Sequence, residues 1–410
     1  MNKSRVSVKQ KLRKKLILKT LIEAGTPVSI AQVTKSISSN YPTVSTLLTQ
    51  LRDEGLVIEL GPGESTGGRR PILYRVNKEK ILFAGVEVGH INSMLLVVNI
   101  ENEIILKGKI ESKSILSSKN PLKVLAENVI EYLEEKLEDI NINMRNLQGV
   151  GFGFAGDIVR YFSGSNENSY LLFRTLEHRL SKYMNFPVLI ENDAKLNTRA
   201  EKWFGKLKNT KNALCISLTW GIGLGIIMGG EFQGGNHGNI EFGHITVKED
   251  GDLCYCGKRG CLETLASGHA LVQKAKKRII AGEKTMLKQI IGSDVEKLNE
   301  EILVNSALDG DIFSIELIIE AAKILGLQIA NLIKLFDPEK VVINGTLSRA
   351  GRLLLNQVKT EVDKRALYYT QESIPIETSD LGEKAIALGA ASLHIQGYLD
   401  IAGTDVEKFV

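Results

Sequence analysis

The first 80 residues place apolar and polar positions in the order expected for three helices followed by a β-hairpin. Residues 9–24 carry apolar side chains every three to four positions, which is the period of an amphipathic helix. Residues 29–36 and 41–54 predict two further helices, the first of them beginning with a serine cap. Short apolar runs at 56–60 and 72–76 predict the strands of the hairpin. This order predicts a winged helix-turn-helix, although three helices alone would also fit a packing module.

The pattern changes at residue 81, where short apolar runs begin to alternate with helices. The runs that predict strands are 81–89, 93–100, 104–112, 148–154 and 187–191. Residues 121–137 predict a long amphipathic helix. Strands alternating with helices predict an α/β architecture, in which ligands bind beyond the carboxyl ends of the strands. Asn192 and Asp193 fall at such an end.

Composition and length are those of a soluble protein with more than one domain. A chain of 410 residues is too long for one ordinary core, and 43% hydrophobic with 24% charged residues is a typical soluble balance. No apolar run approaches the ~18–20 residues that span a bilayer. An amphipathic pattern, instead of a signal-peptide core, follows the basic N-terminus. The sequence therefore predicts a cytoplasmic protein without a membrane partner.

The net charge of +4 conceals a basic N-terminal segment. Residues 1–80 hold 15 Lys and Arg against 6 Asp and Glu, a balance of +9, whereas the remaining 330 residues hold 37 against 42, a balance of −5. A basic segment can simply be solvated. Together with the winged helix-turn-helix pattern, however, it favours DNA as the partner of this segment alone.

Two groups of side chains are candidates for DNA contacts. The polar face of residues 41–54 carries short side chains that can reach base edges or phosphates. The hairpin loop GPGESTGGRRP carries paired arginines, which suit the electronegative minor groove. The predicted DNA-contacting residues are Tyr41, Thr43, Ser45, Thr46, Arg69 and Arg70.

One histidine and three cysteines have the spacing of a metal site. They are His244, Cys254, Cys256 and Cys261. One imidazole and three thiolates form a closed tetrahedral set for structural Zn²⁺. The alternatives are a disulfide or buried free thiols, and a disulfide is disfavoured in a chain without a secretory signal.

Two carboxylates flank the metal motif. Glu241 precedes His244 by three residues, and Glu263 follows Cys261 by two. If one ring nitrogen of His244 binds the metal, the other becomes a fixed donor that can face a ligand. Such a set suits a polyhydroxylated molecule, because each hydroxyl needs an acceptor as well as a donor. The alternative is that both glutamates are solvated surface charges.

The motifs E-x-G-H and C-x-C-G-x-x-G-C-x-E in this stretch resemble the signature of the ROK family (repressors, uncharacterised reading frames and sugar kinases). The segment STGGRRP is similar to the wing of ROK repressors, especially the xylose repressors, and the chain also resembles the N-acetylglucosamine repressors. The resemblance implies two α/β lobes of the actin-like, ribonuclease H-like type. The expected division is a winged helix-turn-helix at 1–80, a first lobe at 81–195 joined by the C-terminal helix at 384–410, and a second lobe with the zinc motif at 196–383.

The resemblance also implies a complete sugar site. Five positions match residues that bind sugar in the family, and they are Asn192, Asp193, Glu241, His244 and Glu263. In the kinases of the family the aspartate is the general base that takes the proton from the attacking hydroxyl.

The nucleotide side departs from the kinase pattern. ROK kinases have a D-x-G-G-T-K-like turn, whereas residues 87–92 place Glu87 at the aspartate and His90 at the second glycine. The second phosphate loop, G-T-G in the kinases, has Ile222 in place of threonine, and the adenosine motif ends in Asn344-Gly345 instead of paired glycines. Phosphoryl transfer depends on positioning and charge neutralisation, so we expect no useful kinase activity.

These expectations combine into a sugar-responsive transcriptional regulator, a repressor of carbohydrate-utilisation genes. The expected partners are operator DNA, a sugar or sugar phosphate effector, and further copies of the chain in a homodimer or dimer of dimers, with structural Zn²⁺ as cofactor. A dimer would present two recognition helices about 34 Å apart. The alternatives are an ATP-dependent sugar kinase with an accessory DNA-binding unit, and a regulator controlled by a protein partner.

Overall fold

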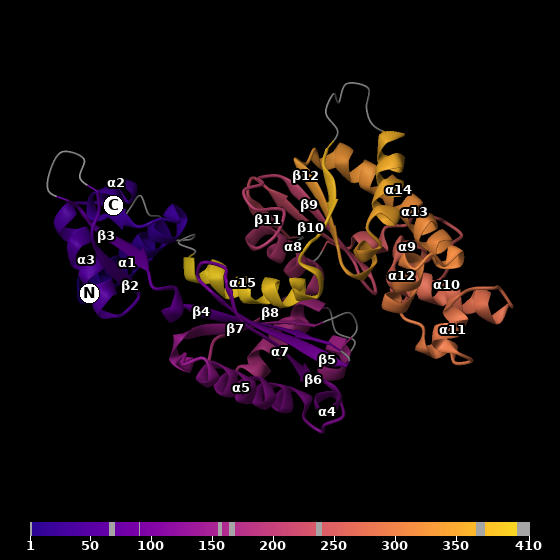
Figure 1. Ribbon diagram of the computed structural model, residues 1–410, viewed down its shortest axis with the longest axis horizontal. Coiled ribbons are helices and arrows are strands. Elements are labelled where there is room, and N and C mark those ends of the chain that lie inside the picture. Colours follow the sequence, from indigo (N-terminus) through magenta and orange to yellow (C-terminus); the bar gives the residue numbers. More distant parts are fainter. Residues whose placement is uncertain are drawn as a thin grey trace.

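The computed structural model consists of a small N-terminal unit, which we call the head (residues 2–80), and two α/β lobes, which we call the body (Figure 1). The structure describes residues 2–64, 70–89, 91–154, 158–163, 169–234, 240–365 and 374–399. Within these ranges, no helix is long and apolar enough to cross a membrane. The head lies at one end of the molecule and the second lobe at the other.

The head contains three helices and a three-stranded antiparallel sheet. Its helices are α1 (Asn2–Ala24), α2 (Ile30–Ser36) and α3 (Tyr41–Asp53). Its strands, in the sheet order β1-β3-β2, are β1 (Val28–Ser29), β3 (Ile72–Val76) and β2 (Val57–Pro62). The predicted helices and hairpin are confirmed, although α1 begins seven residues earlier than the apolar pattern indicates. Strand β1 was not predicted, because two residues are too few to show an alternation.

Polar caps and one buried face explain how the helices of the head begin and pack. Ser29 caps α2 by accepting a hydrogen bond from the backbone N–H of Gln32, and Asn40 caps α3 through the N–H of Thr43. Helix α3 packs on α1 and α2 through a stripe of buried aliphatic side chains. These are Val44, Leu47, Leu48 and Leu51. The opposite face of α3 stays polar and accessible.

The first lobe is built on a five-stranded mixed sheet with the order β6-β5-β4-β7-β8. Its strands are β4 (Leu82–Val88), β5 (Asn92–Asn99), β6 (Ile104–Glu111), β7 (Leu147–Phe154) and β8 (Val188–Asn192). The first three are antiparallel, and the last two run parallel to β4. Its helices are α4 (Lys113–Leu116), α5 (Pro121–Asp139), α6 (Val159–Ser163) and α7 (Ser169–Leu180).

The second lobe repeats this arrangement with the sheet order β11-β10-β9-β12-β13. Its strands are β9 (Ala213–Leu218), β10 (Ile222–Met228), β11 (Glu231–Gln233), β12 (Lys340–Asn344) and β13 (Ile376–Thr378). Its helices are α9 (Glu263–Ala266), α10 (Gly268–Ile280), α11 (Leu287–Ile291), α12 (Glu300–Leu308), α13 (Ile312–Phe336) and α14 (Arg352–Asp363). In both sheets an antiparallel run of three strands is followed by two parallel ones, which confirms the two-lobed α/β body.

Two further helices connect the parts. Helix α8 (Asp193–Trp203) begins where β8 ends, and α15 (Ala385–Leu399) packs on α8 and on β4, β5 and β7 of the first sheet. Figure 1 shows α15 running across that sheet, with its C-terminal end toward the head. There Tyr398 meets Phe83 edge to face, with ring centroids 5.8 Å apart, in a hydrophobic cluster shared with α1. The head is therefore packed on the body through α15.

Candidate functional site

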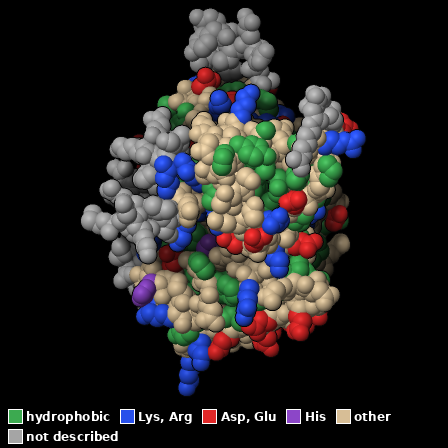
Figure 2. All heavy atoms as spheres, turned by 90° about the vertical axis from the view of Figure 1, so that its left-hand side faces the viewer, with side chains coloured by type: hydrophobic (Ala, Val, Ile, Leu, Met, Phe, Trp, Pro, Cys, Tyr) green, Lys and Arg blue, Asp and Glu red, His purple; other side chains and the backbone are tan. Residues whose placement is uncertain are grey.

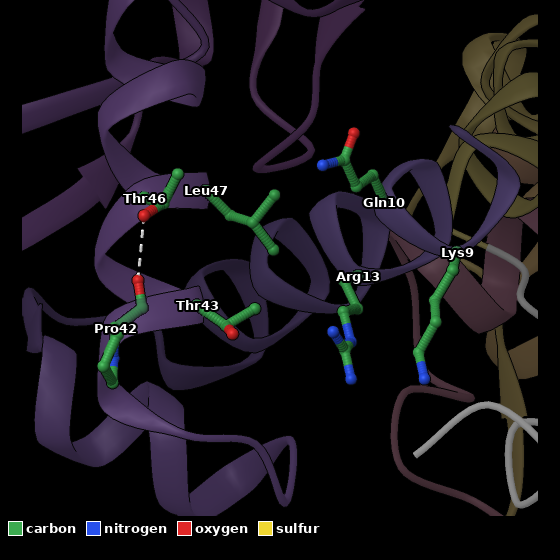
Figure 3. Close-up of a pocket in the computed structure, with 7 residues that line it drawn as sticks. All are labelled: Lys9, Gln10, Arg13, Pro42, Thr43, Thr46 and Leu47. Atoms are coloured by element: carbon green, nitrogen blue, oxygen red, sulfur yellow. Dashed lines mark hydrogen bonds between the residues drawn. The ribbon is translucent and has the colours of Figure 1, made fainter. Parts of the chain in front are cut away.

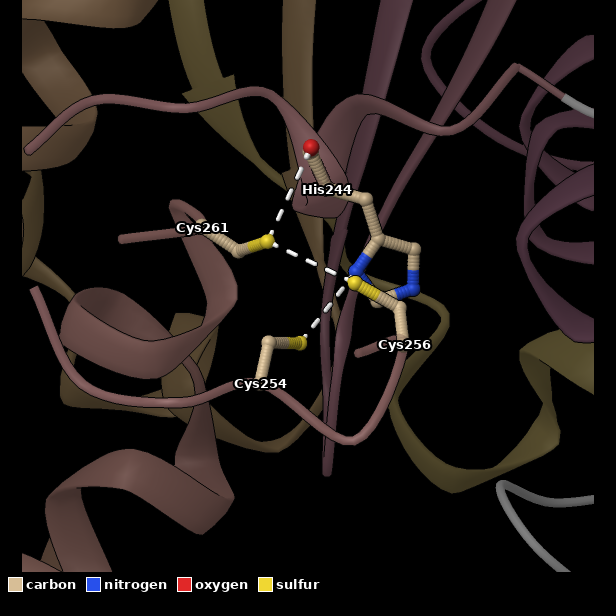
Figure 4. A group of neighbouring side chains, drawn as sticks. All are labelled: His244, Cys254, Cys256 and Cys261. Carbon is tan, nitrogen blue, oxygen red and sulfur yellow. Dashed lines mark hydrogen bonds between the residues drawn. The ribbon is translucent and has the colours of Figure 1, made fainter. Parts of the chain in front are cut away.

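The histidine and three cysteines of the metal motif come together in one cluster (Figure 4). Their ligand atoms all lie within 4.8 Å of one another. His244 ends a short 3-10 helix, η4 (Phe242–His244), and the cysteines follow on the next loop. Cys254 and Cys261 are buried, whereas Cys256 is exposed.

The distances in this cluster fit a tetrahedral zinc site. Sγ of Cys254 lies 3.6 Å from Nδ1 of His244, and the Sγ atoms of Cys256 and Cys261 are 3.6 Å apart. Bonds to zinc of about 2.3 Å from sulfur and about 2.0 Å from nitrogen, arranged tetrahedrally, give ligand separations of about 3.5–3.8 Å. The cysteines are not disulfide-bonded. These four residues could therefore hold Zn²⁺, which would fix the loop between them.

The second ring nitrogen of His244 faces groups that can bind a ligand. Nε2 lies 3.2 Å from the hydroxyl of Tyr255 and 4.0 Å from a carboxylate oxygen of Glu241. With Nδ1 on a metal ion, Nε2 carries the proton and donates it. Burial and the nearby Glu263 carboxylate raise the pKa of the Tyr255 hydroxyl. Tyr255 was not among the predicted site residues, and its position between two metal ligands is the signal that could have found it.

Glu263 is buried at the start of α9 and is held by the turn between β9 and β10. Its Oε2 accepts a hydrogen bond of 2.9 Å from the backbone N–H of Ile222. Gly221 has no room for a side chain, because a Cβ there would lie 2.6 Å from the same oxygen. The glycine-rich turn that resembles a phosphate loop thus positions a carboxylate.

Asn192 and Asp193 lie beside the same turn, where β8 ends and α8 begins. The amide oxygen of Asn192 caps α8 by accepting a hydrogen bond of 3.0 Å from the N–H of Ala194. Its NH₂ group is therefore the part of this side chain that can donate to a ligand. A Cβ on Gly223 would lie 2.3 Å from Cβ of Ala194, so the start of β10 packs directly on the first turn of α8. This contact brings Asp193 into the region of Glu263.

Glu87 faces Asp193 from the end of β4. Glu87 is largely enclosed, and burial together with the neighbouring Asp193 carboxylate raises its pKa to about 7. In the sequence, Glu87 stands out only because it occupies the position of the kinase aspartate. The structure places it near Asp193, one of the residues predicted to bind sugar, whereas His90 lies outside the described residues.

Replacing Glu87 with glutamine should make the free energy of unfolding less dependent on pH. Because the folded pKa of Glu87 is raised from 4.5 to about 7, its stabilising contribution is fully present below pH 4.5 and is lost as the pH rises through 7. At pH 8 we expect Glu87→Gln to be more stable than wild type by at most about 3 kcal/mol, with little difference at pH 5. Urea denaturation from pH 5 to 8 measures this, with the exposed Glu79→Gln as control. Parallel pH profiles for wild type and Glu87→Gln would contradict it.

Three backbone N–H groups at the turn between β9 and β10 are used within the protein. The N–H of Ile222 is bonded to a carboxylate. At the start of α10, Gly268 and His269 donate their N–H groups to the carbonyl oxygens of Thr219 and Trp220, at 3.0 and 3.1 Å. Helix N-termini bind phosphate through such groups when they are free. This turn therefore offers no cradle for a nucleotide phosphate through those groups.

The polar residues predicted to contact DNA lie on the accessible face of α3. Tyr41 is 56% exposed, Thr46 is exposed, and Thr43 and Ser45 are partly exposed. Figure 2, which turns the head toward the viewer, shows Lys and Arg side chains among uncharged and acidic groups. Arg70 is exposed at the start of the second hairpin arm, whereas Arg69 lies outside the described residues.

A pocket of about 380 Å³ is lined by residues of α1 and α3 (Figure 3). Lys9, Gln10 and Arg13 line it from α1, and Thr43 and Thr46 are among its residues on α3. The two basic side chains extend from α1 toward the same side of the pocket. Neither forms an ion pair within the part of the chain that the structure describes. Lys9 and Arg13 thus extend the candidate DNA interface; their four-residue spacing was visible in the sequence, but their position beside α3 was not.

Comparison with known proteins places these features in one family. A family model described as ROK family matches residues 83–397. A putative xylose repressor from Caldicellulosiruptor sp. (strain Rt8B.4) is 33% identical over 399 residues, which cover 95% of this chain and 97% of the relative.

Two solved structures have the same fold. A ROK family transcriptional regulator, a homolog of the E. coli MLC protein, has a TM-score of 0.73 at 24% identity and covers 95% of this chain and 96% of its own. A ROK family glucokinase from Streptomyces griseus, in complex with glucose and AMPPNP, has a TM-score of 0.62 at 28% identity and covers 76% of this chain and 98% of its own. From the family match and the similarity along nearly the whole chain, it follows that this protein belongs to the ROK family.

Proposed function

We propose that this protein is a sugar-responsive, DNA-binding transcriptional regulator that represses carbohydrate-utilisation genes. The observation that carries the proposal is that all five positions predicted to bind sugar are filled in a body on which the head is packed through α15. The match to the putative xylose repressor covers 95% of the chain and so includes the head, whereas the match to the glucokinase covers 76%.

The proposed effector is a sugar or sugar phosphate held in the cleft between the lobes. Its binding residues are Asn192, Asp193, Glu241, His244 and Glu263. The carboxylates accept hydrogen bonds from sugar hydroxyls, while the NH₂ of Asn192 and Nε2 of His244 donate. A structural Zn²⁺ on His244, Cys254, Cys256 and Cys261 orients the imidazole. We propose no kinase activity, because the N–H groups of Ile222, Gly268 and His269 are used within the protein and Asp193 would have no bound ATP to act on.

The route from effector to DNA follows two helices. Asp193 is the first residue of α8, and Leu196 one turn later packs against Ile386 and Ala390 of α15. Helix α15 contacts α1 of the head, and Tyr398 in its last turn packs against the hydrophobic cluster that the two helices share. A shift of α8 on effector binding would therefore move α15 and reorient the head. In a homodimer such a shift changes the separation of the two α3 helices, which the operator requires to be about 34 Å.

The proposed DNA-binding unit is residues 1–80, and the body at 81–410 is the sensor. Helix α3 enters the major groove with Tyr41, Thr43, Ser45 and Thr46 facing the bases. Arg69 and Arg70 of the wing reach the minor groove. Lys9 and Arg13 bind the phosphates that flank α3.

Replacing Lys9 or Arg13 with alanine should weaken the affinity for DNA to the same extent for the operator and for other sequences. Each cation that contacts a phosphate contributes about 1 to the slope of log affinity against log salt, so each substitution should lower that slope by about 1. Fluorescence anisotropy over a potassium chloride series measures this. Lys19→Ala is the control, since Lys19 lies on α1 outside the pocket and 3.8 Å from Glu23. Slopes equal to wild type in both pocket variants would remove α1 from the interface.

The proposed function is tested by operator binding in the presence of a sugar panel. One sugar or sugar phosphate should bind to the purified protein and change its affinity for the operator, while a coupled assay for ADP release shows no turnover. Turnover in the enzyme range of ~1–100 s⁻¹ would establish the kinase alternative. Operator binding without any sugar effect would favour control by a protein partner.

A further inference from the structure

The turn between β9 and β10 presents Trp220 to solvent beside the proposed sugar-binding residues. Trp220 is 43% exposed, whereas Leu218 and Ile222 on the flanking strands are buried. The next residue, Gly221, lies against the Glu263 carboxylate. An indole has an apolar face that favours burial against another flat or apolar group, so its exposure at this place calls for a partner.

The imidazole of His269 packs against the indole of Trp220. The two ring centroids are 4.1 Å apart at an interplanar angle of 44°, and the backbone N–H of His269 donates to the carbonyl oxygen of Trp220. Nδ1 of His269 is buried and has no hydrogen-bond partner among the described residues. Buried polar atoms nearly always form a hydrogen bond. We therefore expect a further group to bond to Nδ1 of His269.

The surroundings of Trp220 do not favour an anion. The N–H groups of Ile222, Gly268 and His269 are all used internally. A Cβ on Gly268 would lie 3.0 Å from a carboxylate oxygen of Glu300, so a negative charge stands at the start of α10. A neutral group with an apolar face is the ligand that fits here.

The position of Trp220 matches a second sugar ring. Gly223 lies against Ala194, next to Asp193, and Trp220 is three residues earlier in the chain. Gly221, which follows Trp220, lies against the Glu263 carboxylate, so the indole belongs to the residue next to this contact with a proposed sugar-binding side chain. A second ring, joined by a glycosidic bond to a first ring held at Glu263, is the neutral group that would lie next to Trp220.

We propose that Trp220, backed by His269, stacks on the second ring of a disaccharide effector whose first ring occupies the polar site. The inference rests on the proposed function and narrows its ligand from sugars in general to glycosides. Trp220 is then a specificity-determining residue that distinguishes disaccharides from monosaccharides.

The test uses the fact that the chain has two tryptophans. Trp203→Phe leaves Trp220 as the sole indole, so a change in its emission reports contact with a ligand. The probes are D-xylose, D-glucose, their β-1,4-linked disaccharides xylobiose and cellobiose, and glucose 6-phosphate. One disaccharide should change the emission and bind on the order of tenfold more tightly than its monosaccharide. Binding is also measured by calorimetry in Trp220→Ala and Trp220→Phe.

Trp220→Ala should lower the affinity for that disaccharide to the level of the monosaccharide, while Trp220→Phe retains part of the difference. The inference is overturned if no disaccharide binds more tightly than its monosaccharide, or if Trp220→Ala weakens both equally. Tighter binding of glucose 6-phosphate than of glucose would also overturn it, because the turn would then hold an anion. If none of the probes binds, the proposed sugar function fails together with the inference. In the other outcomes a sugar still binds, so only the inference about Trp220 fails.

Discussion

Replacing Cys256 with serine is expected to remove the zinc ion and most of the affinity for the effector. The four ligand atoms already lie within 4.8 Å of one another, so the folded loop is arranged for a metal ion. A site with four protein ligands contributes its binding free energy to folding, and losing one thiolate removes much of that contribution. The loop that carries His244 and leads to Glu263 should then lose its fixed geometry.

The expected loss of effector affinity is at least about tenfold, which is the value of one hydrogen bond to a charged group. Elemental analysis should find one zinc per chain in wild type and none in Cys256→Ser, and calorimetry measures the sugar affinity of both. Cys215→Ala is the matched control, because Cys215 is the cysteine that lies outside the cluster, buried in β9. Zinc-free protein that binds the effector as well as wild type would show that the metal has no part in the site.

The features that the sequence predicted are those set by residues close together in the chain. The helix cap at Ser29 acts within three residues, and the metal cluster lies within the 18 residues from His244 to Cys261. Apolar periodicity likewise marked the strands of the first sheet. In each case the side-chain chemistry and the spacing carry the prediction without knowledge of the tertiary fold.

The features that it missed depend on contacts between distant segments. The electrostatic interaction of Glu87 with Asp193 and the hydrogen bond between Glu263 and the N–H of Ile222 join residues on different elements, which no local pattern encodes. The family resemblance matched the glycine-rich segment to the phosphate loop of the kinases without its hydroxyl, and in the fold its glycines make room for a carboxylate and for α8.

Replacing Glu263 with glutamine should weaken effector binding about 10–100-fold and leave the fold intact. Glutamine keeps the shape of the side chain and an oxygen that can accept the hydrogen bond from Ile222, so the turn should hold its position. The carboxylate charge is lost, and hydrogen bonds between a charged group and a hydroxyl are worth about 1.5–3 kcal/mol. Calorimetry with the sugar that binds wild type measures the loss, and thermal denaturation checks that the variant remains folded.

Glu263→Gln should also raise the sugar concentration at which the protein's affinity for the operator changes. We expect that concentration to rise by the same factor as the loss of sugar affinity. Linkage requires this, because the coupling between the two ligands depends on the sugar affinities of the two states of the protein. Glu249→Gln is the control, since Glu249 is an exposed glutamate on the loop of the metal motif. Operator binding is measured against sugar concentration for all three proteins. If Glu263→Gln binds sugar as wild type does, the effector site lies elsewhere in the molecule. If the variant binds sugar weakly but its affinity for the operator still changes at the sugar concentration that acts on wild type, sugar binding at this site does not control DNA binding.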